Sequence, residues 1–182
     1  NGVTPRRFLA LANPRLAALV TEAIGDGWPT DLERLRRLEP LADDAPFRAK
    51  WRAVKRANKA DLAAVVEARA GVACDPDSLF DVQVKRIHEY KRQHLNVLHV
   101  VALWQRLRRE PQAALPPRTV VFGGKAAPGY RMAKLVIKLV HSVAEVVNAD
   151  PATRGRLRVA FVPDYNVTNC MPIFPAAELS EQ

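Results

Sequence analysis

Cysteine is scarce in this 182-residue chain, which has only Cys74 and Cys170. Two thiols are too few for a disulfide framework and match no metal-binding spacing, so a reduced, cytoplasmic compartment is the default expectation. Long apolar runs are also missing. The longest, from Leu95 to Trp104, is interrupted by a histidine and is far too short to span a bilayer. The N-terminus has no signal peptide pattern. These absences argue against a membrane protein and against a disulfide-stabilised secreted domain.

Acidic side chains are in the minority, with 19 aspartates and glutamates against 28 lysines and arginines and a net charge of +9. The imbalance is concentrated after residue 80, where 15 of the basic side chains lie but only 8 of the acidic ones. A basic excess favours an anionic partner, yet by itself it does not separate nucleic acid, membrane and phosphate. The hydrophobic fraction of 48% is that of an ordinary globular chain, long enough to bury a core without cross-links.

The first part of the chain is predicted to be helical. Thr4-Pro5 is a good helix start, because a hydroxyl can cap the helix and proline at the first position loses no hydrogen bond. Apolar spacing continues a helix to residue 24, with a break or restart at Asn13-Pro14. We expect further helices over residues 31–38 and 45–70, the second of them ended by Gly71.

After residue 78 the pattern changes to alternating strands and helices. Strands are predicted at 78–84, 119–122 and 157–162, and helices at about 87–109 and 130–148. This order is typical of right-handed βαβ units. The expected fold class is therefore α/β, a Rossmann-like parallel sheet with helices on both faces. We expect residues 1–78 to form a helical segment that leads into an α/β portion over residues 79–182.

The segment from Lys85 to Arg92 contains four basic residues where a strand is predicted to meet a helix N-terminus. Open α/β sheets bind ligands at this edge. Cations at a helix N-terminus oppose the helix dipole, and a phosphate bound there would resolve the conflict. A solvated basic surface without a ligand is the alternative. A second candidate is the glycine-rich turn Gly123-Gly124, where small residues let the backbone approach a ligand closely, or form a tight turn without one.

Other patterns carry less chemistry. His88-Glu89 begins like the zinc motif HExxH, but Arg92 stands where the second histidine is needed, so no metal site is expected there. The remaining histidines have no carboxylate or cysteine at ligand spacing along the sequence, and no metal site is predicted. The aromatic residues of the basic helix at 45–60 lie with its apolar positions, so nucleic acid is not expected as a partner.

Four blocks closely resemble the glycogen (α-glucan) phosphorylase family: NGVTPRR at the start, FDVQVKRIHEYKRQ at 80–93, RTVVFGGKAAPGY at 118–130 and PAAELSEQ at the end. The resemblance runs through the whole chain. It implies an enzyme that transfers a terminal glucosyl unit of an α-1,4-glucan to orthophosphate, giving α-D-glucose 1-phosphate. It also implies pyridoxal 5′-phosphate (PLP) as cofactor, a cytoplasmic homodimer, and the first part of the C-terminal domain of a two-domain GT-B type glycosyltransferase, with no membrane partner.

The resemblance also implies roles for single residues. Lys85 matches the family lysine at the PLP phosphate, whereas Arg86 and Lys91 match the pair that grips the substrate phosphate. Tyr90 matches the tyrosine that contacts the glucosyl unit, and Asn1 the asparagine that hydrogen-bonds its 6-hydroxyl.

Two further matches, Tyr165 and Gln182, fall on positions that line the coenzyme pocket. The family lysine that forms the Schiff base lies beyond the SEQ tripeptide with which this chain ends, so we expect a piece of a longer protein that is inactive in isolation. The stretch Asn169–Phe174 also departs from the family, where it is usually more polar. A stand-alone phosphate or sugar-phosphate binding module, or a structural remnant without any site, are the alternatives.

Overall fold

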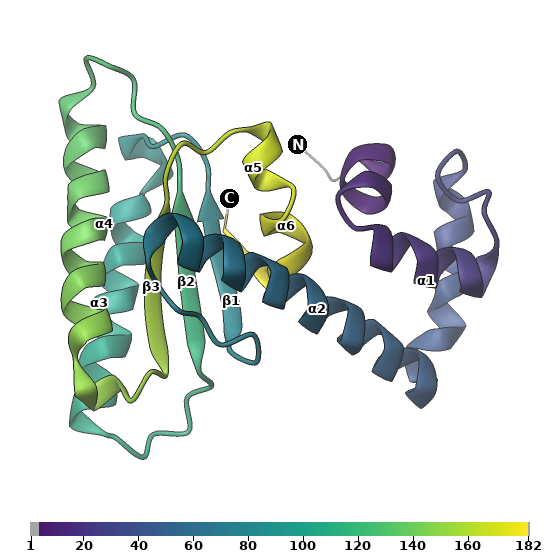
Figure 1. Cartoon of the computed structure of the whole chain (residues 1–182), viewed down its shortest axis with the longest axis horizontal. Helices are drawn as coiled ribbons and strands as arrows, with labels where there is room; N and C mark the ends of the chain where they lie inside the picture. The colour runs from purple at the N-terminus through teal and green to yellow at the C-terminus, as the bar shows by residue number, and fades with distance from the viewer. Residues whose placement is uncertain (1–3, 182) are drawn as a thin grey trace.

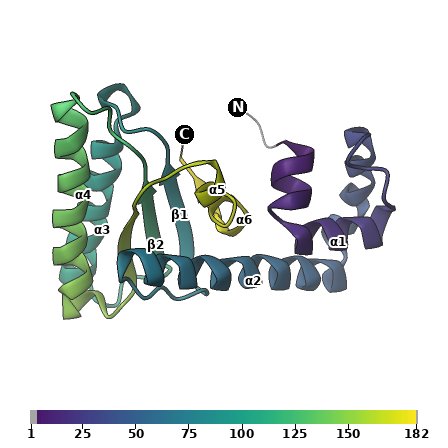
Figure 2. The same ribbon diagram turned by 45° about the horizontal axis from the view of Figure 1, so that its top comes forward.

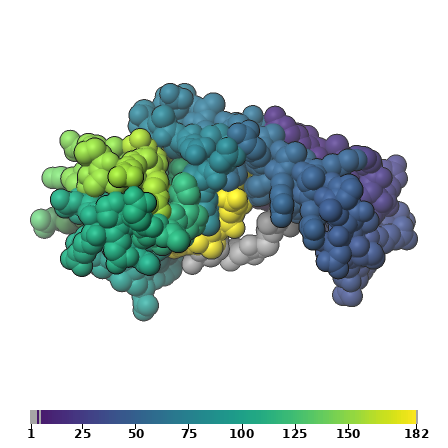
Figure 3. Space-filling model, turned by 90° about the horizontal axis from the view of Figure 1, so that it is seen from below, coloured from purple at the N-terminus to yellow at the C-terminus, as the bar shows by residue number. Residues whose placement is uncertain are grey.

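The computed structural model describes residues 4–181 and shows two groups of elements joined by one long helix (Figures 1 and 2). The first group contains a short π-helix, η1 (Pro5–Leu11), helix α1 (Pro14–Ile24) and a 3-10 helix, η2 (Leu32–Asp43). Helix α2 (Ala45–Ala70) runs from this group to the sheet. The molecule is therefore elongated, with the sheet at one end and the first helices at the other (Figure 3).

Local capping explains where these helices begin and end. The Asn13 side chain accepts a hydrogen bond from the backbone N–H of Leu16 at 3.3 Å, so the predicted break at Asn13-Pro14 is confirmed. Asp44 caps α2 in the same way, accepting from the N–H of Phe47 at 2.7 Å. Gly71 ends α2 with a φ of 67°, a left-handed conformation that glycine adopts without strain.

Four parallel strands form the sheet, in the order β3-β2-β1-β4. They are β1 (Leu79–Val84), β2 (Arg118–Gly123), β3 (Leu157–Val162) and the short β4 (Leu179–Ser180). The three longer strands match the predicted ones to within a residue or so, and β4 was not predicted. Because all strands run the same way, their carboxyl ends meet at one edge of the sheet.

Helices cover both faces of this sheet, which confirms the predicted α/β class (Figure 1). On one face, Leu62 and Val66 of α2 pack with Phe80 and with Ile173 of the short helix α6 (Ile173–Ala176). The other face lies under α3 (Gln93–Arg109) and α4 (Arg131–Ala149), whose apolar residues form a second core. Among the described residues, no helix is both long and apolar enough to cross a membrane.

The predicted helix at 87–109 begins six residues later than expected. Residues 85–92 form a loop with one 3-10 turn, η3 (Glu89–Lys91), and Arg92 has a φ of 55°, which interrupts any helix before α3. The His88 side chain caps η3 by accepting from the N–H of Tyr90 at 3.4 Å. The basic cluster therefore lies on a structured loop ahead of the helix, with Arg92 at the N-cap of α3 itself.

Candidate anion-binding site

Lys85 and Arg86 directly follow β1 at the carboxyl edge of the sheet. The backbone pairing of β1 and β2 continues beyond the strands, because the N–H of Lys85 donates to Gly123 O at 2.9 Å and that of Ile87 to Lys125 O at 3.1 Å. The basic loop is thus fixed against the glycine-rich turn by main-chain hydrogen bonds. This is the edge where open α/β sheets bind ligands.

Gly124 is the point of closest approach between these two loops. A Cβ atom built at Gly124 would lie 2.3 Å from the carbonyl oxygen of Lys85 and 2.7 Å from Cδ1 of Ile87. Its φ is not positive, so the requirement for glycine is one of space. The neighbours at this turn are the Lys85 carbonyl and the Ile87 side chain, so the predicted approach to a ligand stays a prediction, and the glycine sets the position of the first cation.

The side chains of Lys91 and Gln93 form hydrogen bonds to the backbone of the basic loop at Arg86 and so stabilise its conformation. The carbonyl oxygen of Arg86 accepts from Lys91 Nζ at 3.1 Å and from Gln93 Nε2 at 3.2 Å. Gln93 Oε1 in turn accepts from the N–H of His88 at 3.3 Å, and Gln93 is almost fully buried. Lys91 also lies over the Tyr90 ring, 5.6 Å from its centroid. These contacts bring Lys91 back towards Arg86, the residue with which it was paired in the prediction.

Three cations of this loop have no carboxylate partner among the described residues, although Glu89 lies on the same loop and accepts a hydrogen bond from Tyr130. In the part of the chain that the structure describes, Lys85, Arg86 and Lys91 form no ion pair with a carboxylate. Partial burial lowers the pKa of Lys85, and repulsion from Lys91 lowers it further. Nearby Lys125 differs, since its Nζ lies 2.9 Å from Asp164. The loop therefore presents positive charge that an anion would stabilise.

An open pocket of about 420 Å³ adjoins this loop. Arg86, Lys125 and Tyr165 line it together with apolar and amide side chains, which are those of Phe8, Asn166, Val167, Cys170 and Phe174. Burial, followed by the neighbouring thiol of Cys170, raises the pKa of Tyr165 to about 12. Its phenol is thus protonated at neutral pH and able to donate a hydrogen bond.

The structure brings some of the predicted site residues together and not others. Arg86 and Tyr165 share the pocket, and Lys85 and Lys91 interact through their charges. Tyr90 is 71% exposed and packs on the His88 ring, with the centroids 4.3 Å apart. Asn1 and Gln182 lie outside the described residues, so their predicted roles have no structural counterpart here.

Sequence reasoning missed that Phe8 belongs to this pocket. Its ring packs edge-on against Phe174, with the centroids 5.4 Å apart, and so connects η1 to α6. The structure also shows where the unusual stretch Asn169–Phe174 lies. It spans the end of α5 (Val167–Cys170) and the start of α6, and it buries Cys170 and Ile173. No local pattern could have indicated the contact between Phe8 and Phe174, because they are far apart in the sequence.

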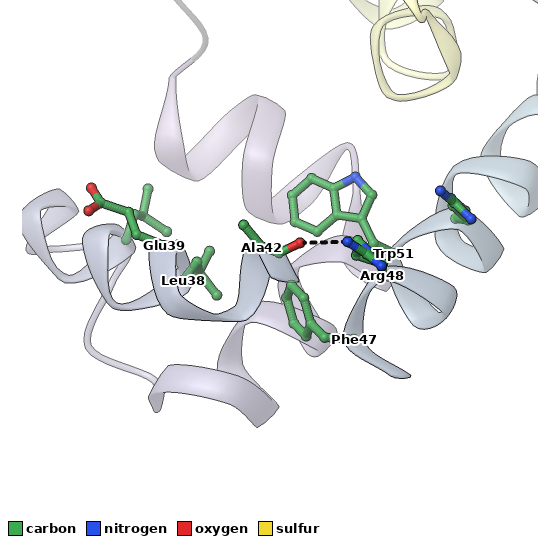
Figure 4. Close-up of a pocket in the computed structure, with 8 residues that line it drawn as sticks. Leu38, Glu39, Ala42, Phe47, Arg48 and Trp51 are labelled. Carbon is green, nitrogen blue, oxygen red and sulfur yellow. Dashed lines mark hydrogen bonds between the residues drawn. The ribbon is translucent and has the colours of Figure 1, made fainter. Parts of the chain in front are cut away.

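A second, largely apolar hollow of about 480 Å³ lies between η2 and the first turns of α2 (Figure 4). Leu38, Phe47 and Trp51 line it, and Arg48 Nη1 donates to the carbonyl oxygen of Ala42 at 3.4 Å across its edge. None of the predicted site residues lies here. Its lining also includes Glu39 and Arg52, but it lies away from the carboxyl ends of the strands, where open α/β sheets bind ligands, so that edge of the sheet is the better candidate site.

The fold and the site together define an α/β protein with a basic loop at the carboxyl ends of parallel strands. Comparison with known proteins gives the family: residues 1–182 match the carbohydrate phosphorylase family, and the chain belongs to it. It is 57% identical over 182 residues to a glycogen phosphorylase of Synechocystis and 52% identical to the muscle form of human glycogen phosphorylase. The alignments cover all of this chain but only 21% and 22% of these relatives.

Proposed function

We propose that this chain supplies the phosphate-binding part of an α-1,4-glucan phosphorylase, which transfers a terminal glucosyl unit to orthophosphate and releases α-D-glucose 1-phosphate. Family membership and the names of the relatives support the reaction class. In this proposal residues 79–182 belong to the C-terminal domain of a two-domain, GT-B type enzyme, and residues 1–78 lead into it. The longer enzyme would be a cytoplasmic homodimer.

The observation that carries the proposal is the uncompensated charge of Lys85, Arg86 and Lys91 on one fixed loop. Phosphorolysis with a phosphorylated cofactor places two phosphate groups close together, where they repel each other. Several cations from one short segment offset this repulsion. Arg86 offers a planar guanidinium suited to two phosphate oxygens, and the Lys91 and Lys85 ammonium groups act as point charges. Arg86 and Lys91 would hold the substrate phosphate and Lys85 the cofactor phosphate.

The residues of the adjoining pocket fit PLP in size and chemistry. About 420 Å³ is within the usual range for a small-molecule site, and the lining combines cations with aromatic rings. When bound, PLP supplies a phosphate whose second pKa near 6 suits proton exchange at neutral pH. Lys85, which precedes the lining residue Arg86 but does not itself line the pocket, would hold that phosphate at the edge of the pocket, and the Tyr165 phenol would donate a hydrogen bond. Gln182 is proposed for the same pocket, and the Schiff-base lysine would come from outside this chain.

The glucosyl unit would meet Tyr90, which projects from the loop and is open to solvent. Contact with the tilted His88 ring limits the freedom of the Tyr90 ring without covering it. Asn1 would hydrogen-bond the 6-hydroxyl. A phosphate held by Arg86 and Lys91 next to such a sugar would also stabilise positive charge that develops on the ring during transfer.

A chimaera tests the proposal. The matching segment of the Synechocystis glycogen phosphorylase would be replaced by this chain, and glucose 1-phosphate formation from maltodextrin and phosphate measured. We expect an active chimaera whose Arg86→Ala and Lys91→Ala variants lose at least a hundredfold in kcat/KM for phosphate. Arg109→Ala, at the far end of α3, is the matched control and leaves the rate unchanged. A folded, active chimaera indifferent to both site substitutions would refute the assignment.

The isolated chain is expected to form no glucose 1-phosphate, and measurable product from it would contradict this expectation. The second candidate function, a phosphate or sugar-phosphate binding module, is favoured by one observation: the basic loop and its pocket are formed within this chain. A phosphate titration followed by NMR distinguishes the two. Saturable binding that Lys85→Ala abolishes, together with an inactive chimaera, favours the module, and no binding with an inactive chimaera favours a structural remnant.

A further inference from the structure

A second polar cluster lies between the sheet and α3, away from the basic loop. At its base is Asp81 of β1, whose side chain is fully buried. Arg118 Nη1 donates to Asp81 Oδ2 at 2.8 Å, whereas Oδ1 has no hydrogen-bond partner among the described residues. An unpartnered carboxylate oxygen away from water is costly, so this atom calls for a further partner.

Two other side chains that can coordinate a metal ion lie close to Asp81. His99 of α3 and Glu181, just after β4, have donor atoms that lie with an Asp81 oxygen within 4.8 Å of one another. The backbone fixes this meeting, since Asp81 pairs with Leu179 in the β1–β4 register and the N–H of Glu181 donates to Val82 O at 2.8 Å. The three residues come from three elements, which is why their spacing in the sequence predicted no site.

We propose that Asp81, His99 and Glu181 bind one divalent transition-metal ion, with Zn²⁺ as the best match. One imidazole and two carboxylates form a ligand set that suits Zn²⁺ better than Mg²⁺, which prefers oxygen ligands alone. Burial, followed by the charge of Asp81 and a hydrogen bond to it, raises the pKa of Glu181, and a cation between the two carboxylates would replace the proton that they otherwise share. The ion would fill the open coordination of Asp81 Oδ1 and tie β1, α3 and the β4 edge together.

The site needs a small closure around the ion. Metal–ligand distances of about 2.0–2.2 Å place neighbouring ligand atoms roughly 3.3–3.6 Å apart in a tetrahedral site. In the structure the three ligand atoms lie within 4.8 Å of one another, which leaves room for them to move closer around an ion. Asp81 is buried and held by Arg118, but His99 is exposed and Glu181 half-buried, so these two can move inward by side-chain rotation. Asp81 would thus be a fixed ligand, His99 and Glu181 would adjust to the ion, and the ion could enter from solvent.

A second buried oxygen without a partner lies close by on the same helix. Asn96, one turn before His99 on α3, donates from Nδ2 to Gln83 Oε1 at 3.1 Å, yet its Oδ1 has no partner among the described residues. Gln83 follows Asp81 by two residues on β1, so both side chains lie on the face of the sheet that α3 covers. The space between β1 and α3 is thus polar in a way that the surrounding apolar core is not.

The test is Zn²⁺ binding to the chelator-stripped 182-residue chain, measured by competition with a chromophoric chelator. We expect one Zn²⁺ per chain, and at least a tenfold higher Kd for His99→Ala and for Glu181→Gln. His94→Ala, on the same helix, is the matched control and leaves the Kd unchanged. Both ligand substitutions are at solvent-accessible positions, and circular dichroism checks that the variants fold.

Cobalt substitution gives an independent reading. Co²⁺ bound to the proposed ligands should show the visible absorption of a low-symmetry site, and His99→Ala should abolish it. Binding that is weaker than a hundred micromolar or so, or that is insensitive to His99→Ala and Glu181→Gln, overturns the proposal; the second result would assign the metal to the cysteines or to other histidines. A third result also overturns the proposal: the chain takes up no metal, and Glu181 and Asp81 only share a proton.

Discussion

Replacing Gly124 by alanine tests whether the glycine-rich turn sets the position of Lys85. The added methyl group would lie 2.3 Å from the Lys85 carbonyl oxygen, whereas carbon and oxygen normally stay at least about 3.3 Å apart. The two loops must therefore separate by about 1 Å. Main-chain hydrogen bonds on both sides of this contact, from Lys85 to Gly123 and from Ile87 to Lys125, resist that movement.

The expected cost follows from two opposing effects. Overpacking of this kind destabilises by about 1–3 kcal/mol. Alanine also restricts the unfolded chain, which returns about 0.4–1 kcal/mol because the φ of Gly124 is one that alanine accepts. The midpoints of the two ranges leave a net loss of about 1 kcal/mol, a fall in Tm of roughly 2–4 °C for a chain of this length. Urea denaturation and thermal melting measure it.

Gly129→Ala is the matched control for this experiment. Gly129 lies six residues after Gly123 on the same connection, its φ is not positive, and a Cβ atom there would have nothing within 4 Å. We expect Gly129→Ala to be neutral or slightly stabilising. If Gly124→Ala were as stable as the wild type, or if the two variants behaved alike, the steric reasoning would be wrong.

Three further results are expected. Leu62→Ala, which empties a fully buried position under the sheet, should lower the free energy of unfolding by about 2–5 kcal/mol in urea denaturation. Arg118→Ala leaves the buried Asp81 carboxylate unpaired and should cost about 3 kcal/mol by the same measurement, with the exposed Arg109→Ala as control. The pKa of Tyr165 rises from 10 to about 12 on folding, so the folded state holds the phenol proton more tightly than the unfolded state. The free energy of unfolding should therefore fall as the pH rises from 10 to 12. Tyr165→Phe should make that fall shallower in thermal melts recorded across this pH range.

The sheet was largely predictable from the sequence. The continuous apolar runs in β2 and β3 and the alternation before Lys85 predicted the three longer strands, because buried parallel strands leave little other use for such residues. Gly71 and the Asn13-Pro14 pair correctly marked helix boundaries, since their effect is local. Two-residue β4 was missed because a strand so short has no periodic pattern.

The loop before α3 was mispredicted for a physical reason. Apolar spacing from residue 87 is compatible with a helix, yet side-chain bonds from Gln93 to both Arg86 and His88 stabilise a loop, and Arg92 takes a left-handed conformation. These bonds compete with the helix and leave no trace in a hydrophobic pattern. The pairing of Phe8 with Phe174 was likewise beyond reach, because only the tertiary fold brings them together.

Helix α2 connects the first group of helices with the sheet. Its 26 residues extend for about 39 Å, at about 1.5 Å of rise per residue. Near its middle, Lys55 Nζ donates to the carbonyl oxygens of Pro175 at 2.7 Å and Ala177 at 2.8 Å, which fastens the helix to the segment that leads into β4. The first group of helices is therefore joined to the sheet in two places, through α2 at this point and through the contact of Phe8 with Phe174 beside Arg86.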